Sequence, residues 1–263
     1  MNVDGCTALI TGASAGLGAE FARQLGTRAA GLVLVARRED RLRALRDELT
    51  AQNPRLTVHV RPADLSQPGD VAALGDWLAA EGIAVQLLIN NAGLGDRGAF
   101  AASAPERVSE MLAVNVVALT LLTRRLLPPL LAAKRGAILN VSSSASFLPM
   151  PSLGVYAATK AYVTSFSEAL RSELRGSGVT VTALCPGPVH TEFDQVARRT
   201  DHPNLGVAPE FTYVSAVEVV RSALAAVEQD RAIVVPGLMM KLAMLIVRLT
   251  PMPLLRLAGA ATK

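Results

Sequence analysis

Two side chains that lie four residues apart could carry acid–base chemistry. Tyr156 and Lys160 open a segment, 156–175, whose sequence predicts a helix ended by glycines. Residues four apart share one face of a helix, so the phenol and the ammonium would be neighbours. The ordinary pKa of tyrosine is about 10, and a nearby positive charge lowers it. Such a pair could give a proton to a carbonyl oxygen or take one from an alcohol.

Hydroxyl and amide groups come before this pair in the chain. A predicted strand, 137–141, is followed by a run of serines between residues 142 and 146, which could orient a substrate oxygen or form turn hydrogen bonds. Asn115 lies among β-branched residues in a predicted helix, 105–133, where an amide is unusual on a packed face. Asn115 could belong to the same site, bend the helix or face solvent.

A glycine-rich turn, T-G-A-S-A-G-L-G, runs from Thr11 to Gly18 between a predicted strand and a predicted helix. Glycines permit a tight turn, and the helix N-terminus offers free N–H groups and a partial positive charge to a phosphate. A purely structural turn is the alternative, but the place after the first strand favours dinucleotide binding. The residues predicted to hold the pyrophosphate side are Gly12, Ser14, Gly16, Leu17 and Gly18.

The same turn also matches G-x-S-x-G, the nucleophile motif of serine hydrolases, with Ser14 at its centre. Only thirteen residues precede Ser14. The earlier strands that supply the second oxyanion donor of that fold would be missing, so a serine hydrolase is a remote alternative.

The end of the second predicted strand, 31–36, favours one cofactor. An NAD site usually places an acidic residue there, whereas an arginine accommodates the 2′-phosphate of NADP. This strand is followed by Arg37 and Arg38, and the nearest acids, Glu39 and Asp40, come later. Two solvated arginines at a helix start are the alternative. We expect NADP(H), with Arg37 as the first phosphate ligand, Arg38 as the second and the Ser14 hydroxyl as a further donor.

Apolar runs alternate with helix-like segments along the chain. We expect strands at 6–10, 31–36, 56–60, 85–89, 137–141, 179–184 and 232–235, and helices at 16–28, 38–51, 69–80, 105–133, 156–175 and 214–228, with a bend or break near Pro128-Pro129. Strands without polar alternation, each followed by a helix, indicate a parallel sheet covered on both faces. The predicted fold is α/β: a doubly wound Rossmann-type fold with a seven-stranded, mostly parallel sheet of order 3-2-1-4-5-6-7.

Such sheets bind ligands beyond the carboxyl ends of their strands, so the loops there matter most. After the third predicted strand come Asp64 and Leu65, where the carboxylate could accept from an adenine amino group or cap the next helix. After the fourth come Asn91, Ala92 and Gly93, which could contact the cofactor or form a simple turn.

Taken together, these motifs resemble those of the short-chain dehydrogenase/reductase family. The matching motifs are T-G-x-x-x-G-x-G at 11–18, N-N-A-G at 90–93, Y-x-x-x-K at 156–160 and P-G-x-V-x-T at 186–191. They occur in the family's order, each in the loop that its role requires. The resemblance implies a reductase or dehydrogenase that transfers hydride between NADP(H) and a carbonyl or alcohol substrate.

The resemblance also implies roles for single residues. Tyr156 would be the general acid/base and Ser143, thirteen residues earlier, would orient the substrate oxygen. Lys160 would bind the nicotinamide ribose as well as tune the tyrosine, and Asn115 would hold a water in a proton relay. The segment 90–93 would shape the adenosine side of the cofactor site. The nicotinamide carboxamide would be held by Pro186, Gly187, Val189 and Thr191. Relatives pair through the helices predicted here at 105–133 and 156–175, so we expect a homodimer or homotetramer.

The substrate side is predicted from composition alone. Residues 1–236 form one predicted dinucleotide-binding and catalytic domain, with a lid at about 188–213. Phe147, Leu148, Met150 and Leu153 would give the pocket an apolar lining and favour an apolar ketone or aldehyde, with carbonyl reduction as the expected direction. A non-catalytic NADP(H)-binding sensor is the alternative function.

Composition excludes several other classes. The net charge is +4, but the basic residues are scattered, which argues against nucleic acid. Cys6 and Cys185 lie in apolar runs and no metal-ligand spacing occurs, so we expect buried thiols, no metal and a cytoplasmic location. The tail, 237–263, is apolar and basic. We expect a helix at 238–249 that contacts a membrane surface or packs over the pocket or a second subunit.

Overall fold

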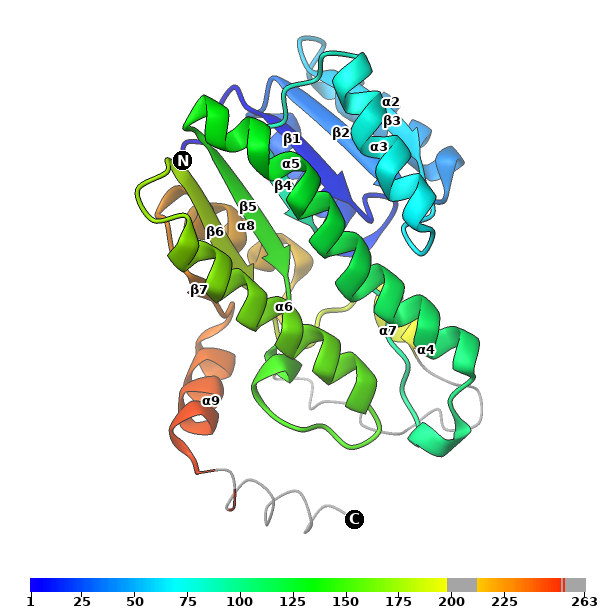
Figure 1. The fold of residues 1–263 in the computed structure, drawn as a ribbon, viewed down its shortest axis with the longest axis vertical. Helices are drawn as coiled ribbons and strands as arrows, with labels where there is room; N and C mark the ends of the chain where they lie inside the picture. Colours follow the sequence, from blue (N-terminus) through cyan, green and yellow to red (C-terminus); the bar gives the residue numbers. More distant parts are fainter. Residues whose placement is uncertain (198–211, 252, 254–263) are drawn as a thin grey trace.

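Seven parallel strands form one sheet of order β3-β2-β1-β4-β5-β6-β7, so the predicted fold is confirmed and every neighbouring pair is parallel (Figure 1). The computed structural model describes residues 1–197, 212–251 and 253. The strands are β1 (Thr7–Thr11), β2 (Gly31–Ala36), β3 (Thr57–Pro62), β4 (Leu87–Asn90), β5 (Gly136–Val141), β6 (Val179–Leu184) and β7 (Ile233–Val234). The strand order reverses between β1 and β4, where such sheets form a crevice.

Helices cover both faces of the sheet because the strand side chains alternate between two apolar cores. Ile10 and Leu34 point into one core, while their neighbours Leu9 and Val33 point into the other. The first core is closed by α1 (Gly16–Gly26), α2 (Glu39–Gln52) and α8 (Ala216–Glu228). The second is closed by α3 (Pro68–Ala80), α5 (Leu119–Ala133) and α6 (Gly154–Glu173), which lie in front of the sheet in Figure 1.

A chain of buried polar side chains ties the centre of the sheet to the helices of the second face. The Asn90 amide donates to Thr123 Oγ1 on α5 and to Asn140 Oδ1 on β5, each at 2.9 Å. Asn140 in turn donates to Ser167 Oγ on α6 at 2.9 Å. These groups are almost fully buried. Each one left unpaired would cost about 1–3 kcal/mol, so the network fixes one arrangement of β4, β5, α5 and α6.

The predicted long helix 105–133 is present but its irregularity lies elsewhere than expected. It consists of α4 (Pro105–Leu112), a π-helical turn η2 (Ala113–Ala118) and α5, which continues through Pro128 and Pro129. By length and composition alone, the stretch Pro105–Ala133 could cross a membrane. Here its apolar side packs on the sheet and Thr123 joins the buried network, as in a core helix.

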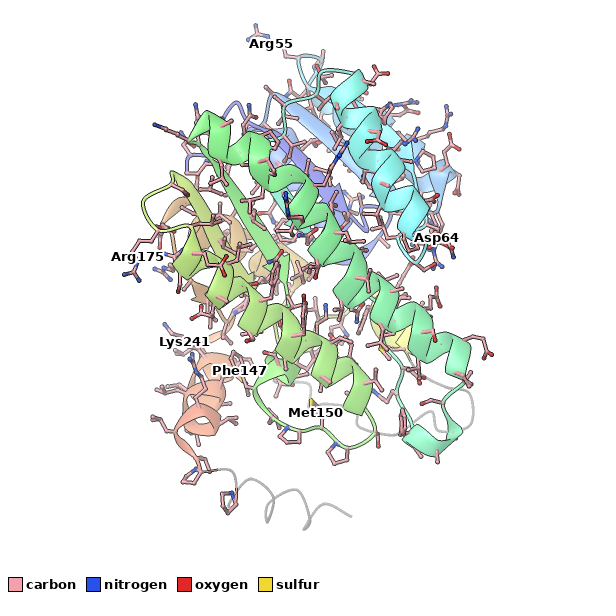
Figure 2. The ribbon with its side chains drawn as sticks, in the orientation of Figure 1. Arg55, Asp64, Phe147, Met150, Arg175 and Lys241 are labelled. Carbon is pink, nitrogen blue, oxygen red and sulfur yellow. The ribbon has the colours of Figure 1, made fainter. Side chains whose placement is uncertain are left out.

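The chain beyond β7 forms a separate helix, α9 (Leu238–Leu249), at the carboxyl edge of the sheet. It contacts η3 (Ser144–Phe147), the short 3-10 turn after β5. Figure 2 shows Lys241 on this helix above Phe147, on the same side of the molecule as Met150. Most of the predicted lid, 198–211, lies outside the described residues; its first part forms α7 (Glu192–Ala197).

Candidate active site

A cavity of about 460 Å³ lies at the carboxyl edge of the sheet, next to the switch point between β1 and β4. Loops from six strands contribute to its wall, as the parallel arrangement requires. The sequence-predicted residues that line it are Gly12, Ser14, Gly16, Leu17, Arg37, Arg38, Asp64, Leu65, Asn91, Ala92, Gly93, Ser143, Tyr156, Lys160, Pro186, Gly187, Val189 and Thr191. Of the predicted set, Asn115 and Gly18 do not line it directly.

Gly18 lies behind the turn and allows it to close. A Cβ on Gly18 would lie 2.2 Å from the Gly12 carbonyl oxygen and 2.6 Å from Asn91 Nδ2. Gly12 itself has φ of 67°, and its Cβ would lie 2.9 Å from Ala92 Cα. Glycine is thus required at both positions, and the turn lines the cavity at the start of α1, where a pyrophosphate would fit.

Tyr156 and Ser143 meet in this cavity. A hydrogen bond with Ser143 and the charge of Arg97 both lower the pKa of Tyr156, but burial dominates and raises that pKa to about 12. This direction is opposite to the effect of a nearby positive charge alone. The reason is that the desolvation of the phenolate outweighs the favourable partners. The protein alone therefore holds Tyr156 as a neutral phenol, which is a proton donor.

Lys160 lies on the same face of α6 as Tyr156, with Nζ 5.7 Å from the centre of the tyrosine ring. Its ammonium donates to the Val141 carbonyl oxygen at 2.8 Å, at the end of β5. Burial lowers the pKa of Lys160 to about 8. The lysine is therefore closer to neutrality than an exposed lysine, although its ammonium form still predominates at pH 7.

Asn115 is buried within the π-helical turn and does not line the cavity, but it contacts residues that do. Its side chain accepts from Leu94 N at 2.8 Å and donates to Leu94 O at 2.9 Å and to Thr159 Oγ1 at 3.0 Å. A Cβ on Gly93 would lie 3.3 Å from Lys160 Nζ and 3.5 Å from Asn115 Oδ1. The structure thus brings Asn115, Gly93 and Lys160 together, and π-helical turns are frequent at such sites.

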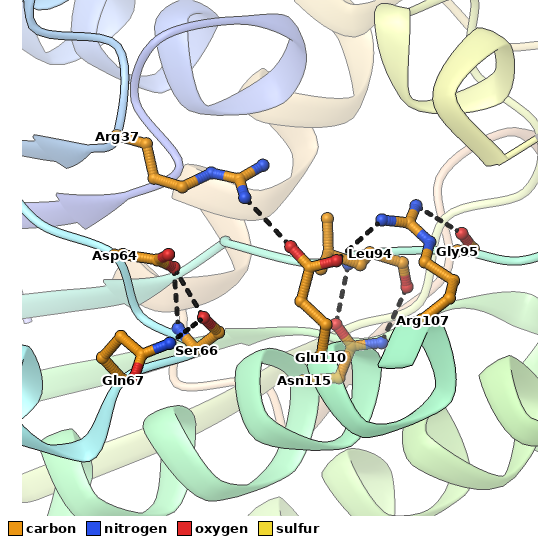
Figure 3. A network of polar contacts seen from close by, with 9 residues as sticks. All are labelled: Arg37, Asp64, Ser66, Gln67, Leu94, Gly95, Arg107, Glu110 and Asn115. Atoms are coloured by element: carbon orange, nitrogen blue, oxygen red, sulfur yellow. Dashed lines mark hydrogen bonds and ion pairs between the residues drawn. The ribbon is translucent and has the colours of Figure 1, made fainter. Parts of the chain in front are cut away.

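The two arginines after β2 have different partners. Arg37 forms an ion pair with Glu110 of α4 at 2.9 Å (Figure 3). Arg38 donates to Ser14 Oγ at 3.2 Å and pairs with Glu192 of α7 at 3.0 Å. Arg41 pairs with the other oxygen of the same carboxylate at 2.6 Å. This cluster was missed from the sequence, because nothing in the spacing places Glu192 beside α2.

The loops after β3 and β6 also reach the cavity. Asp64 accepts from Ser66 N and Ser66 Oγ, so its carboxylate closes the turn before α3 while bordering the cavity (Figure 3). After β6, Thr191 packs against Gly16, where a Cβ would lie 3.3 Å from the threonine Cβ. His190 stacks on Tyr213 with ring centroids 4.1 Å apart.

The substrate side of the cavity differs in part from the predicted lining. Met150 and Leu153 line it, but Phe147 and Leu148 do not. Phe147 instead contacts Arg248 of α9, whose guanidinium lies 5.6 Å from the ring centre. The apolar wall is completed by Phe193 of α7, with its ring centroid 5.4 Å from that of Tyr156. Sequence reasoning missed Phe193 because it lies in the irregular lid.

The chain matches known proteins over most of its length. The short chain dehydrogenase family model matches residues 6–202. A very-long-chain 3-oxoacyl-CoA reductase-like protein of Arabidopsis thaliana is 33% identical, covering 81% of this chain and 69% of the relative. A short-chain dehydrogenase from Sphingobium yanoikuyae in complex with NADPH has a TM-score of 0.81 and 33% identity, covering 92% of both chains. A short-chain dehydrogenase/reductase from Burkholderia phymatum in complex with NAD has a TM-score of 0.81 and 30% identity, covering 95% and 94%.

The chain therefore belongs to the short-chain dehydrogenase/reductase family, a family of oxidoreductases, as its motifs indicate. Its solved relatives bind nicotinamide dinucleotides in both the phosphorylated and the unphosphorylated form. The glycine turn, closed on Asn91 and open to the cavity, fits such a cofactor. This membership, rather than the serine-hydrolase alternative, accounts for the motif around Ser14.

The close packing of the glycine turn gives a first prediction. Gly18→Ala places a Cβ against the Gly12 carbonyl, so we expect the turn to open and the affinity for NADPH and NADH to fall by about tenfold or more. Titration calorimetry with each dinucleotide measures the effect. The control is Gly69→Ala on α3, where a Cβ meets nothing within 4 Å. If Gly18→Ala binds both dinucleotides as tightly as Gly69→Ala, the turn is not the pyrophosphate site.

The buried lysine gives a second prediction, which concerns stability. The folded-state pKa of Lys160 is about 8, below the unfolded value of about 10.4. Between these values the unfolded chain binds a proton that the folded chain does not, so this site makes stability rise with pH. We expect Lys160→Met to be relatively more stable at pH 7. Its advantage over the unchanged protein should shrink by about 3 kcal/mol by pH 10.5.

Urea unfolding across this pH range measures the difference. Any constant cost of losing the bond to Val141 cancels in the pH dependence. A difference between the two proteins that stays constant with pH would show that Lys160 has an ordinary pKa.

Proposed function

We propose that this protein is an NADP(H)-dependent carbonyl reductase in which Tyr156 is the general acid/base. The single observation that carries the proposal is the meeting of Tyr156 and Ser143 in the cavity that the glycine turn also lines. When bound, a reduced nicotinamide supplies the hydride. The chain supplies the proton and the positions of the reacting groups.

The roles follow from the contacts. Ser143 orients the substrate oxygen through its hydroxyl while the neutral phenol of Tyr156 gives that oxygen its proton. Lys160 lies beside the phenol and carries donors that can bind ribose hydroxyls. Asn115 bonds to Leu94 and so fixes the loop after β4, including Gly93, next to Lys160. A relay through a water at Asn115 stays a prediction.

A preference for the phosphorylated cofactor is supported by charge at the end of β2. Two guanidinium groups, Arg38 and Arg41, already share one carboxylate, Glu192, and Ser14 accepts from Arg38. A cluster that binds one anion in this way suits a 2′-phosphate, since arginine binds phosphate in bidentate fashion. The contacts favour Arg38 over Arg37 as the main ligand of the 2′-phosphate, because Arg37 pairs with Glu110 of α4 and does not belong to this cluster.

An apolar ketone or aldehyde is supported by the substrate wall, which presents Met150, Leu153, Phe193, Val196 and Tyr213. Carbonyl reduction is supported by the protonated phenol of Tyr156, which carries the proton that a carbonyl oxygen must receive. A relative from Anas platyrhynchos is named a very-long-chain 3-oxoacyl-CoA reductase, which agrees with this direction.

Pairing of chains is part of the same proposal. The outer face of the long helices exposes Leu112, Val117, Leu121, Leu131 and Tyr162. An apolar face of this kind on α4, α5 and α6 suits a self-complementary contact between two copies.

The catalytic role of Tyr156 is tested by Tyr156→Phe. This change removes only the hydroxyl that donates the proton, so we expect kcat for carbonyl reduction to fall by about 10²–10⁴-fold. NADPH affinity should stay within a factor of about three. Stopped-flow NADPH absorbance over a panel of apolar ketones and aldehydes measures the first, and calorimetry the second.

Tyr162→Phe is the matched control, because Tyr162 is also on α6 but bonds to Thr120 on the surface. Normal turnover by Tyr156→Phe would disprove the mechanism. If the unchanged protein binds NADPH tightly but turns over no carbonyl, the alternative function, a non-catalytic NADP(H)-binding sensor, would be favoured.

Cofactor choice is tested by Arg38→Ala and Arg37→Ala in parallel. A charge-assisted hydrogen bond to phosphate contributes about 1.5–3 kcal/mol, so losing Arg38 should lower the NADPH affinity about 10–100-fold. The NADH affinity should change little. Arg43→Ala is the control, since Arg43 pairs with Glu39 on the same helix and lies outside the cavity. Equal losses for both dinucleotides would contradict the phosphate role, and a larger effect at Arg37 would restore the order expected from sequence.

A further inference from the structure

Helix α9 is attached to the rim of the active-site cavity by only part of its surface. Met244 is buried and Met240 is partly buried. Met240 packs against the loop after β6, where a Cβ on Gly187 would lie 2.6 Å from Met240 Cε. Arg248 stacks over Phe147 beside η3. These contacts fix the helix next to the residues that line the cavity.

The opposite side of α9 is apolar and exposed. Its members are Leu238, Met239, Leu242, Leu245, Ile246 and Leu249, with exposed fractions from 46% to 76%. At 3.6 residues per turn they occupy an arc of about 120°, centred opposite Met240 and Met244. We call these six residues the outer face of α9. An apolar surface of this kind marks a binding site for another surface.

The charge of this part of the chain is one-sided. Residues 231–263 contain Arg231, Lys241, Arg248, Arg256 and Lys263 and no acidic residue. Since the whole chain carries +4, residues 1–230 sum to −1, and the net positive charge of the protein comes from residues 231–263. Lys241 and Arg248 are seven residues apart and lie along one flank of the outer face. Exposed apolar side chains flanked by cations are complementary to an anionic lipid surface.

A second copy of the chain fits this face less well. A two-fold contact through α9 would bring the cations of both copies together, which disfavours pairing. The helices α4, α5 and α6 already offer an apolar surface for such a contact. Spanning is also excluded for α9, because its 12 residues extend about 18 Å, and a hydrocarbon core is about 30 Å thick.

We propose that α9 docks on the surface of an anionic membrane, lying in the interface with its outer face among the acyl chains and with Lys241 and Arg248 against lipid phosphates. Because Met240 packs against the loop after β6 and Met244 is buried, α9 is fixed to the cavity rim, and docking would hold that rim close to the membrane surface. This inference rests on α9 alone and does not depend on the reaction proposed above.

Vesicle flotation of the full-length protein tests the proposal. We expect it to float with vesicles of phosphatidylcholine that contain about a third of phosphatidylglycerol, and not with phosphatidylcholine alone. Raising the salt to about 0.5 M should release much of the protein, because screening weakens the contact with lipid phosphates. Failure to float with the anionic vesicles at low salt overturns the proposal.

Two variants separate the apolar and the charged parts. We expect Leu242→Gln with Leu245→Gln and Ile246→Gln, and separately Lys241→Glu with Arg248→Glu, to lower vesicle binding by about tenfold or more. The controls are Val217→Gln on α8 and Arg55→Glu with Arg175→Glu, all at exposed positions away from α9. If the controls lose binding equally, general charge or hydrophobicity explains it and the proposal is wrong.

Sedimentation of the same variants tests the alternative that a second copy of the chain, rather than a membrane, covers the outer face of α9. An outer-face variant that changes from an oligomer to a monomer, with the unchanged protein failing to bind vesicles, would assign the face to a second copy. Circular dichroism and thermal unfolding serve as checks that each variant folds. A variant that is unfolded is replaced by the single change Ile246→Gln, for which a partial loss of binding is expected.

Discussion

The site depends on how closely two loops approach each other at the point where the strand order reverses. The Thr11 hydroxyl donates to Ile89 O at 3.3 Å and accepts from Asn91 N at 2.9 Å and from Ala92 N at 3.0 Å. Asn91 Nδ2 donates to Thr11 O at 2.9 Å. With these groups satisfied, no space is left for a Cβ at Gly12 or Gly18. The crevice opens directly beyond this junction because β1 and β4 are followed by helices on opposite faces.

Burial, more than charge, sets the protonation of the two central side chains. Both Tyr156 and Lys160 are displaced toward their neutral forms, the phenol upward in pKa and the ammonium downward. These two shifts are opposite to those that a phenolate–ammonium ion pair between Tyr156 and Lys160 would produce. Instead, the cavity keeps a proton on Tyr156 and leaves Lys160 responsive to whatever charge or dipole is placed beside it.

The sequence predicted the fold well because its strongest signals are local. Apolar runs without polar alternation specify buried parallel strands, and each predicted strand begins and ends within a few residues of an observed one. The helix α7, at the start of the predicted lid, was not predicted. The loops that follow the strands were predicted to hold the site residues, and they do line one cavity, because the carboxyl ends of parallel strands meet at one edge of the sheet. What the sequence lacked was any sign of the π-helical turn around Asn115, since a π turn depends on how the helix packs against Leu94 and Thr159.

Contacts between distant segments were also beyond the sequence. Nothing in the residues around Glu192 indicates that it lies between Arg38 and Arg41, because that pairing needs the loop after β6 to cross to α2. Burial raises the pKa of Tyr156 because the phenol is enclosed, an effect that the spacing to Lys160 could not reveal. Phe147 was assigned to the cavity from its place in the chain, yet α9 holds it outside.

One short helix connects the two ends of the cavity. Glu192 and Phe193 are consecutive residues at the start of α7, and they face different parts of the site. The carboxylate of Glu192 lies against the arginines at the end of β2, while the Phe193 ring lies 5.4 Å from that of Tyr156. An anion that replaces Glu192 on Arg38 and Arg41 must compete with two ion pairs that fix α7. The same short helix therefore places one side chain against the arginines at the end of β2 and the next beside Tyr156, so that it contributes to both ends of the cavity.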